Sequence, residues 1–499
     1  MTFLKLFQRC EFMIKSVRYI SVILILSIAF LTLSGCGENT DMAPQANVNL
    51  IQNAMNISVN NKTLDTKTLE AQMGAFSGEV NTVYEVLFEQ PTDVNTIVLS
   101  EGTESSVRSF AIEAEKNGEY VRVYEQDIIG SYRYCAFDTI TTNGFRIIIT
   151  EVEKDTQFNI TSTEAFFIQR GREEFKVTSY ALGSDVYKKE FFNSGALNII
   201  TDIIVFGLTS FDSEGSIIYN DILVDNKTVS GKDALKKVIE NVRGFAGQLK
   251  KQVRIHINLL GPDAVGTFNS WEDEMIAKGD LHALAFEDNR EKLVASVISL
   301  VNEFGVDGIY FDYEYPIKSN HKKAFGNFLR ELKKNMPDKI LGAALASWCM
   351  DLSRSAIDSL DAVEIMAYDQ FDFLGNHSSF ESGVSAIEAF IEQGYERKKL
   401  SLGIPFYARP SDQGAFWYSY SLEADKLGKY KNFVTGPALS AEDKCETRYY
   451  NSYQMTYDKT AYAYDSGIGG VMVWHLNCDL PFNNEISLFK AISDSLHSN

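Results

Sequence analysis

Apolar and polar residues alternate closely in the first folded part of the chain. Between residues 47 and 170, apolar positions recur every second residue in short runs such as TVYEVLFE and SFAIEAEKNGEYVRVYE, and Gly, Asn and Asp separate the runs. A period of two with frequent turn residues is typical of half-buried antiparallel strands. This region is therefore predicted to be an all-β sandwich of the jelly-roll kind.

The pattern changes after about residue 175, where apolar runs alternate with amphipathic segments up to residue 499. Eight strands alternating with helices predict an α/β fold, the parallel (β/α)₈ TIM barrel, with its functional residues at the carboxyl ends of the strands. The predicted strands are 176–182, 202–211, 253–261, 308–316, 340–347, 362–369, 399–409 and 469–476, and clear helical periods occur at 233–251, 290–305, 321–336 and 384–394.

The N-terminus has the features of a targeting segment. Two cations precede an apolar run from Tyr19 to Leu33, which is shorter than the roughly 20 residues of a membrane span. Residues 1–35 are therefore predicted to be a secretion signal, with a transmembrane anchor as the alternative, and residues 36–46 a linker. The sequence ending in Gly35-Cys36 resembles the bacterial lipobox, which implies a lipid on Cys36 and a place on the periplasmic or extracellular face of a bacterial cell envelope.

Charge and cysteine content limit the partners. The 47 Lys and Arg against 67 Asp and Glu give a net charge of −20, which disfavours binding to nucleic acid and to anionic lipid headgroups. Membrane contact is therefore expected only through the lipid anchor. The protein is expected to be a monomer. Neither the cysteines nor the six histidines have metal-ligand spacing, so no metal or cofactor is expected. Cys135, Cys349, Cys445 and Cys478 are expected as buried thiols, with a Cys445–Cys478 disulfide as the alternative.

The fourth predicted strand carries acids on one face. Because side chains alternate across a strand, Tyr310, Asp312 and Glu314 share the face directed into the barrel. Two desolvated carboxylates at i and i+2 repel each other, so at least one pKa is expected to rise. Glu314 is the candidate general acid, and an acidic strand end in solvent is the alternative.

These residues match a known pattern. VDGIYFDYEYP closely resembles the signature Asp-x-x-Asp-x-Asp-x-Glu of glycoside hydrolase family 18, which includes chitinases and endo-β-N-acetylglucosaminidases, and the resemblance covers residues 175–499. Three later predicted strands also resemble those of the family. They contain Met366 to Asp369, the segment GIPFYAR with Tyr407 and Arg409, and the segment GGVMVWHL with Trp474. The N-terminal region resembles the discoidin-type, galactose-binding-like module, with Asn117-Gly118 in a hairpin and Arg146 on a strand.

The resemblance implies substrate-assisted catalysis without a cofactor. Glu314 would act as acid and base, Asp312 would hold the N–H of the substrate's 2-acetamido group, and the Tyr368 hydroxyl would bind its oxygen. Trp474 would stack beneath the sugar ring. Further substrate contacts are expected from Asp369, Tyr407, Arg409, Met366 and Tyr310.

Three departures from the family pattern carry expectations. Tyr310 replaces the second acid, so we expect it to hydrogen-bond Asp312 and leave Asp312 ionised and turned toward Glu314. Asn258-Leu259-Leu260-Gly261 replaces Ser-x-Gly-Gly, which puts a close approach of sugar there in doubt. Only about 60 residues separate Tyr407 from Gly469, so we expect no full α+β insertion and an open cleft.

The sequence thus predicts a lipid-anchored retaining glycosidase that cleaves β-1,4 bonds in N-acetylglucosamine glycans, with chitin-type oligomers as the first substrate. Endo-β-N-acetylglucosaminidase activity on N-glycan chitobiose cores is the alternative, because some such enzymes carry an aromatic residue at the position of Tyr310. A carbohydrate-binding lipoprotein without activity is the third hypothesis, against which the presence of Glu314 argues.

Overall fold

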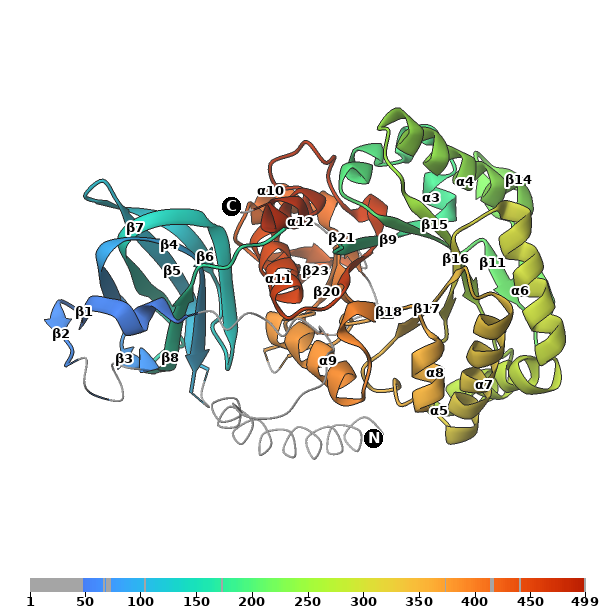
Figure 1. Ribbon diagram of the computed structural model, residues 1–499, viewed down its shortest axis with the longest axis horizontal. Helices are drawn as coiled ribbons and strands as arrows, with labels where there is room; N and C mark the ends of the chain where they lie inside the picture. The colour runs from blue at the N-terminus through green and yellow to red at the C-terminus, as the bar shows by residue number, and fades with distance from the viewer. Residues whose placement is uncertain are drawn as a thin grey trace, which may run out of the picture. The chain divides into compact units, whose positions relative to one another are not determined.

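The computed structural model describes residues 48–65, 68, 73–102, 105–171, 174–372, 374–412, 417–438 and 441–497. The predicted signal and Cys36 lie outside the described residues. The described chain forms an N-terminal antiparallel sheet region and a C-terminal barrel (Figure 1). In this part of the chain, no helix combines the length and apolar character that a membrane crossing requires.

The sheet region has strands that pair only antiparallel. The first half of β4 pairs with β1 and its second half with β8, and register shifts separate the two halves. The buried apolar side chains of these strands form one core. The strands are β1 (Ala54–Val59), β2 (Lys62–Thr63), β3 (Phe76–Gly78), β4 (Val83–Glu101), β5 (Val107–Lys116), β6 (Glu119–Gln126), β7 (Arg133–Val152) and β8 (Phe158–Phe166).

A two-residue hairpin joins β5 to β6, as predicted. Asn117 and Gly118 have φ values of 57° and 87°, and Lys116 pairs with Glu119 across the turn. Two successive positive φ angles match the right-handed twist of the flanking strands, which is why Asn-Gly is favoured there. Arg146 lies on β7 as expected, while the likeness to the discoidin-type module stays a prediction.

Eight parallel strands close the barrel, which confirms the predicted (β/α)₈ fold. Each strand pairs with the next in sequence and the last pairs with the first. They are β9 (Lys176–Leu182), β10 (Asp202–Phe206), β15 (Arg254–Leu260), β16 (Gly308–Asp312), β17 (Ile340–Leu345), β18 (Ala362–Ile365), β19 (Leu400–Pro405) and β24 (Gly470–Trp474).

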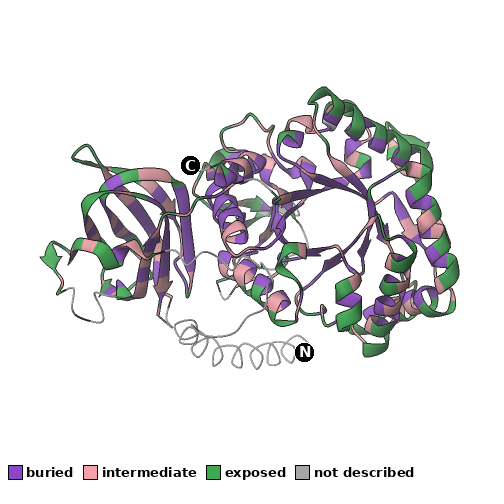
Figure 2. Cartoon of the chain, viewed as in Figure 1, coloured by how far each residue is buried: buried purple, intermediate pink, exposed green. Residues whose placement is uncertain are grey.

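Helices surround these strands and expose only their outer faces, whereas the strands are buried (Figure 2). Their apolar sides and the outer sides of the strands form the main core. The helices are α3 (Gly183–Val186), α4 (Gly231–Gln248), α5 (Trp271–Ala283), α6 (Arg290–Phe304), α7 (Ser319–Asn335), α8 (Arg354–Ser359), α9 (Phe380–Glu392), α11 (Tyr453–Asp465) and α12 (Leu488–Leu496).

Two predicted strands are divided in the structure. The segment 202–211 ends its barrel strand at Phe206, because Gly207 turns the chain with a φ of 84°. Residues after the turn form β11 (Thr209–Phe211), which pairs with β12 (Ile217–Tyr219) outside the closed barrel. The segment 399–409 divides likewise into β19 and β20 (Tyr407–Pro410). The first prediction joined two strands of one sheet that are separated by a turn, and the second joined strands that belong to different sheets.

The segment between Tyr407 and Gly469 contains more regular structure than the expectation of no full α+β insertion allowed. β20 is the first strand of a four-stranded antiparallel sheet with β21 (Tyr418–Ser419), β22 (Phe433–Ala438) and β23 (Ala441–Tyr449), and α10 (Ala424–Leu427) lies between them. The length argument failed because antiparallel strands need only tight connections. The insertion therefore adds a small wall beside the barrel.

The four cysteines that the structure describes are thiols, and three of them are buried as expected. Cys135, Cys349 and Cys478 are buried, and Cys445 is exposed on β23. The prediction of a buried thiol at Cys445 is wrong, because the sheet of the insertion presents this residue to solvent. The alternative disulfide with Cys478 is not formed.

Candidate active site

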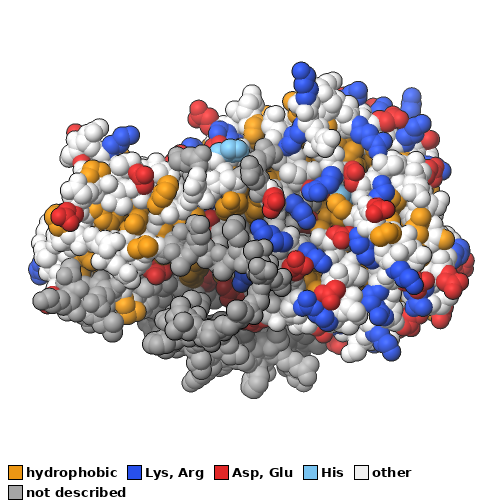
Figure 3. Space-filling view, in the orientation of Figure 1, with side chains coloured by type: hydrophobic (Ala, Val, Ile, Leu, Met, Phe, Trp, Pro, Cys, Tyr) orange, Lys and Arg blue, Asp and Glu red, His pale blue; other side chains and the backbone are white. Residues whose placement is uncertain are grey.

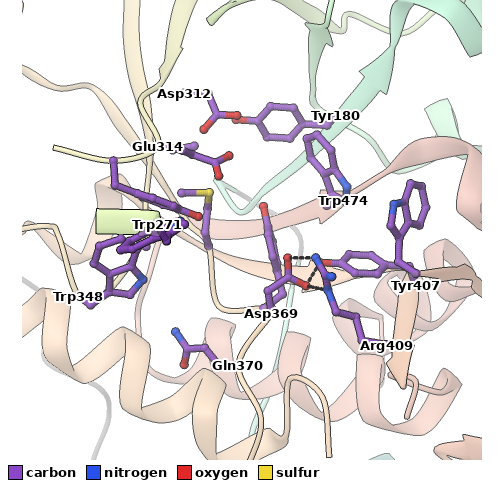
Figure 4. Close-up of a pocket in the computed structure, with 16 residues that line it drawn as sticks. Tyr180, Trp271, Asp312, Glu314, Trp348, Asp369, Gln370, Tyr407, Arg409 and Trp474 are labelled. Carbon is purple, nitrogen blue, oxygen red and sulfur yellow. Dashed lines mark hydrogen bonds and ion pairs between the residues drawn. The ribbon is translucent and has the colours of Figure 1, made fainter. Parts of the chain in front are cut away.

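A pocket of about 480 Å³ lies at the carboxyl ends of the barrel strands. Figure 4 draws the 16 residues that line it. It brings together eight of the predicted site residues, although they come from four different strand ends. These are Asp312, Glu314, Met366, Tyr368, Asp369, Tyr407, Arg409 and Trp474.

The strand ends explain this arrangement. Asp312 is the last residue of β16 and points inward, and Glu314 follows in the loop. β18 ends at Ile365, so Met366 and Tyr368 stand directly above its carboxyl end. Side chains at these positions face the barrel mouth, where TIM barrels carry their functional groups.

Asp312 at the end of β16 and Glu314 in the loop after it form a carboxyl pair. Burial, followed by the charge of Glu314 and a hydrogen bond to it, raises the pKa of Asp312 well above its ordinary value, and the attraction of Lys278 is the weaker effect. This raised pKa runs against the expectation that Asp312 stays ionised. Its Oδ1 atom is buried and has no hydrogen-bond partner among the described residues, so it can bind a polar group of a ligand.

Tyr310 does not reach the pocket, contrary to the prediction. Its ring is fully buried against His256, with ring centroids 5.0 Å apart, and its phenol interacts with Glu364 instead of Asp312. Inward side chains two residues apart on a barrel strand occupy successive layers. Position 310 therefore belongs to the layer beneath the acids, and Tyr310 cannot contact a sugar bound above them.

That lower layer holds an unexpected buried carboxyl. Glu364 is fully buried on β18, and the hydroxyls of Thr178 and Ser401 lie near it. Desolvation by burial raises the pKa of Glu364 to about 8. On the other side of the barrel, His256 Nε2 and Arg254 Nε each lie 2.8 Å from Asp202 Oδ1.

Glu364 makes stability dependent on pH. Its pKa rises from 4.5 to about 8 on folding, so the neutral folded form loses stability relative to the unfolded chain as pH increases from 4.5 to 8. We expect Glu364→Gln to remove part of this loss and to be more stable than wild type at pH 8 by roughly 2–4 kcal/mol. Urea unfolding of both proteins at pH 5 and pH 8 measures the difference, and equal slopes with pH would contradict the assignment.

Asp369 forms an ionic corner on the opposite side of the pocket. Arg409 binds it through Nε to Oδ1 (2.5 Å) and through a terminal nitrogen to Oδ2 (2.6 Å), and the Tyr407 hydroxyl donates to Oδ1 (2.6 Å). Burial raises the pKa of Asp369, but hydrogen bonds from His377, Arg409 and Tyr407 outweigh it and hold the pKa below the usual range. The carboxylate therefore stays ionised and fixes Arg409 at the rim (Figure 4).

Most of the aromatic residues that line the pocket were not predicted from the sequence. Tyr180 lies 5.1 Å from Trp474 between ring centroids, and its phenol points toward Asp312 (Figure 4). The ring centroid of Trp348 lies 4.3 Å from that of Tyr315 and 5.8 Å from that of Trp271. The position of Tyr180 on the inward face of the first strand was a usable signal, whereas the loop tryptophans gave none. Trp417 also lines the pocket.

The third barrel strand makes no approach to the pocket. Asn258 is fully buried inside the barrel, and a Cβ at Gly261 would meet the ring of His282 at 1.8 Å. Gly261 is therefore required by packing against helix α5, which carries His282. The doubt about sugar contact at this strand agrees with the pocket lining, where neither residue occurs.

A carboxyl pair facing stacked aromatic rings at the mouth of a (β/α)₈ barrel is the kind of site that glycoside hydrolases use. The sequence model of the glycosyl hydrolases family 18 matches residues 176–479, more than half of the chain, and the chain belongs to this family.

Curated relatives match part of the chain. It is 25% identical over 249 residues to a class V chitinase of Arabidopsis thaliana, covering 38% of this chain and 63% of that protein. It is 25% identical over 252 residues to chitotriosidase-1 of Mus musculus, covering 39% of this chain and 54% of that protein. It is 23% identical over 337 residues to chitinase A1 of Niallia circulans, covering 53% and 46%. The matches thus span between 46% and 63% of these relatives' own length.

Solved structures share the fold. A chitinase from Bacteroides thetaiotaomicron aligns with a TM-score of 0.50 at 21% identity, covering 65% of this chain and 97% of that chain. Catalytic domain 2 of the Ostrinia furnacalis group II chitinase aligns with a TM-score of 0.50 at 19% identity, covering 66% and 97%. The barrel is therefore the part of the chain that these proteins have in common.

Proposed function

We propose that the protein is a retaining glycosidase that cleaves β-1,4 bonds in chitin-type N-acetylglucosamine oligomers. The observation that carries the proposal is the Asp312–Glu314 pair, which lies in an aromatic pocket where burial raises the pKa of Asp312. Membership of family 18 supports it, as do the chitinase names of the relatives. Charges of both signs are intermingled over the barrel face in Figure 3, which suits a neutral sugar chain.

The proposed reaction needs no protein nucleophile. Glu314 in its protonated form gives a proton to the glycosidic oxygen as the bond from that oxygen to the anomeric carbon breaks, and Asp312 is the ionised member of the pair at this step. The carbonyl oxygen of the substrate's own 2-acetamido group bonds to that carbon, and the enforced geometry gives this attack a large effective molarity. Water then attacks the same carbon as the bond to the acetamido oxygen breaks, and Glu314 takes the water's proton, so two inversions retain the configuration.

Neighbouring groups hold the acetamido group in this scheme. The unpartnered Oδ1 of Asp312 accepts the acetamido N–H, and the Tyr368 hydroxyl donates to the acetamido oxygen. Trp474 offers a flat apolar face beneath the sugar, while Asp369 and Arg409 bind its hydroxyls from the side. All of these residues line the pocket, as these roles require.

The proposal includes a place for the protein. A lipid on Cys36 would hold it at the surface of a bacterial cell envelope, as the apolar run and the lipobox-like sequence suggest. Metabolic labelling with a fatty acid analogue tests this part, because Cys36→Ala should abolish the label. A labelled variant would refute lipidation at that residue and leave the catalytic proposal unaffected.

Substrate assistance gives the first activity prediction. Chitotetraose should be cleaved, whereas cellotetraose, which has the same linkage and a hydroxyl in place of each acetamido group, should stay intact. The reason is that only the acetamido oxygen can attack the anomeric carbon. Mass spectrometry of the products measures both, and equal cleavage of the two tetrasaccharides would refute the mechanism.

The same assay separates the alternatives. Incubation with chitin oligomers and with a high-mannose glycoprotein distinguishes chitinase activity from endo-β-N-acetylglucosaminidase activity on N-glycan cores. Release from neither, with retained binding, would favour a carbohydrate-binding protein. Tyr310 no longer supports the N-glycan alternative through sugar contact, since it lies beneath the pocket.

A further inference from the structure

Helix α11 lies between the sheet region and the barrel, and the sequence analysis assigned no function to it. It contacts β7 on one side and β19, β24 and α9 of the barrel on the other. Nearly all of its residues are buried, including two charged ones, Asp458 and Lys459. Neighbouring positions on a helix point in different directions, so these two side chains serve different neighbours.

Asp458 faces the sheet region. It accepts hydrogen bonds from the Arg133 guanidinium (3.0 Å), the Tyr124 hydroxyl (2.6 Å) and the Ala136 backbone N–H (3.1 Å). The Gln454 side chain donates to the Ala136 carbonyl at 2.8 Å. An apolar cluster from both parts of the chain surrounds these bonds. The sheet region therefore fixes the position of α11 with directional bonds.

Lys459 faces the barrel. Its Nζ donates to the Ser378 carbonyl (2.8 Å) and to the Ser378 hydroxyl (3.1 Å), and it is fully buried. In the described chain no carboxylate lies within ion-pair distance of it, and burial lowers its pKa to about 7. A buried lysine without a counter-charge is costly, so its two bonds to one residue require an explanation.

Ser378 lies at the end of the loop that carries Asp369, the residue that pairs with Arg409 in the pocket. The Ser378 hydroxyl donates to the Ala367 carbonyl at 2.8 Å, and Nε2 of the preceding His377 lies 3.2 Å from Asp369 Oδ1. Ser378 and Asp369 have φ values of 49° and 60°. This left-handed conformation is uncommon for residues other than glycine, and it persists only where surrounding contacts enforce it.

We infer that Lys459 is a positioning residue for substrate binding: it holds Ser378, and through it the loop from Ala367 to Ser378, so that Asp369 and Arg409 keep their places in the pocket. The sheet region contributes to the active site in the same way, because it fixes the helix that carries Lys459. This inference rests on the proposed function. It gives the N-terminal region a role that requires no sugar bound to it.

The test compares two lysines. Lys459→Met should lower kcat/KM for chitotetraose about tenfold, mainly by raising KM, because the loosened corner binds substrate and transition state alike. Lys251→Met is the control: Lys251 also donates to two backbone carbonyls, of Leu197 and Ile200, but just before β10 and β15 begin, at the opposite end of the barrel. It should leave kcat/KM within twofold of wild type.

The outcomes are distinct. A Lys459→Met protein that is folded and keeps kcat/KM within twofold of wild type overturns the inference. If that variant does not fold, Ser378→Ala decides by the same limits, since it keeps the lysine and removes one of its two acceptors. Chitotetraose affinity in the Glu314→Gln background should fall with Lys459→Met as well. A wild-type chain that neither cleaves nor binds chitotetraose would instead refute the proposed function, and this inference with it.

Discussion

Replacing Glu314 by Gln is expected to lower kcat on chitotetraose by about 10³-fold, because the amide cannot give a proton to the leaving oxygen. The substitution keeps the size of the side chain, and Asp312, Tyr368 and Trp474 remain in the pocket. Binding should therefore be nearly unchanged. Initial rates and calorimetric titration with chitotetraose measure the two quantities separately.

The control for this variant is Glu287→Gln, an exposed carboxyl that does not line the pocket. It should match wild type in rate and affinity. Turnover by Glu314→Gln close to that of wild type would contradict the assignment of the acid. Loss of affinity together with rate would mean that Glu314 acts in binding.

Removing the carboxylate of Asp458 is expected to destabilise the protein by about 3–5 kcal/mol, because the Arg133 guanidinium is left buried without its counter-charge. The Arg133 and Asp458 side chains are 3% and 0% exposed. Burial raises the pKa of Asp458 to about 6, so the carboxylate is ionised at pH 8. Urea unfolding of Asp458→Ala and wild type at pH 8 measures the difference in free energy.

A surface pair provides the comparison. Glu153 pairs with Arg108 at 2.5 Å, but its side chain is 56% exposed, so Glu153→Ala should cost less than about 1 kcal/mol. If Asp458→Ala costs no more than this control, the sheet region is not held to α11 as described. The proposed role of Lys459 would then lose its support from the sheet region, while the catalytic proposal would stand.

The barrel was predictable because local patterns specify it. Apolar strands and amphipathic helices alternate eight times, and short-range periodicity suffices to place them. The strand ends were less accurate: Gly207 ends β10 early and the chain after Pro405 enters another sheet. Those ends depend on which sheet each segment joins, and sheet membership depends on residues distant in the sequence.

The pocket was predictable only in part, and for the same reason. Glu314 and Tyr368 follow barrel strands and Trp474 is the last residue of one, so a strand assignment places them. Trp271 and Trp417 lie in segments whose course depends on tertiary packing, and nothing local predicted that they line the pocket. Tyr310 was assigned to the right face of its strand but to the wrong layer.

The amino-acid sequence alone determined the fold, the family and the order of the functional residues, because these depend on patterns within single strands and helices. Only the tertiary structure decided that burial raises the pKa of Asp312, that Glu364 lies buried beneath the pocket and that α11 links the sheet region to Ser378. A pKa and a buried hydrogen bond depend on every group within a few ångströms. Those groups come from segments up to hundreds of residues apart.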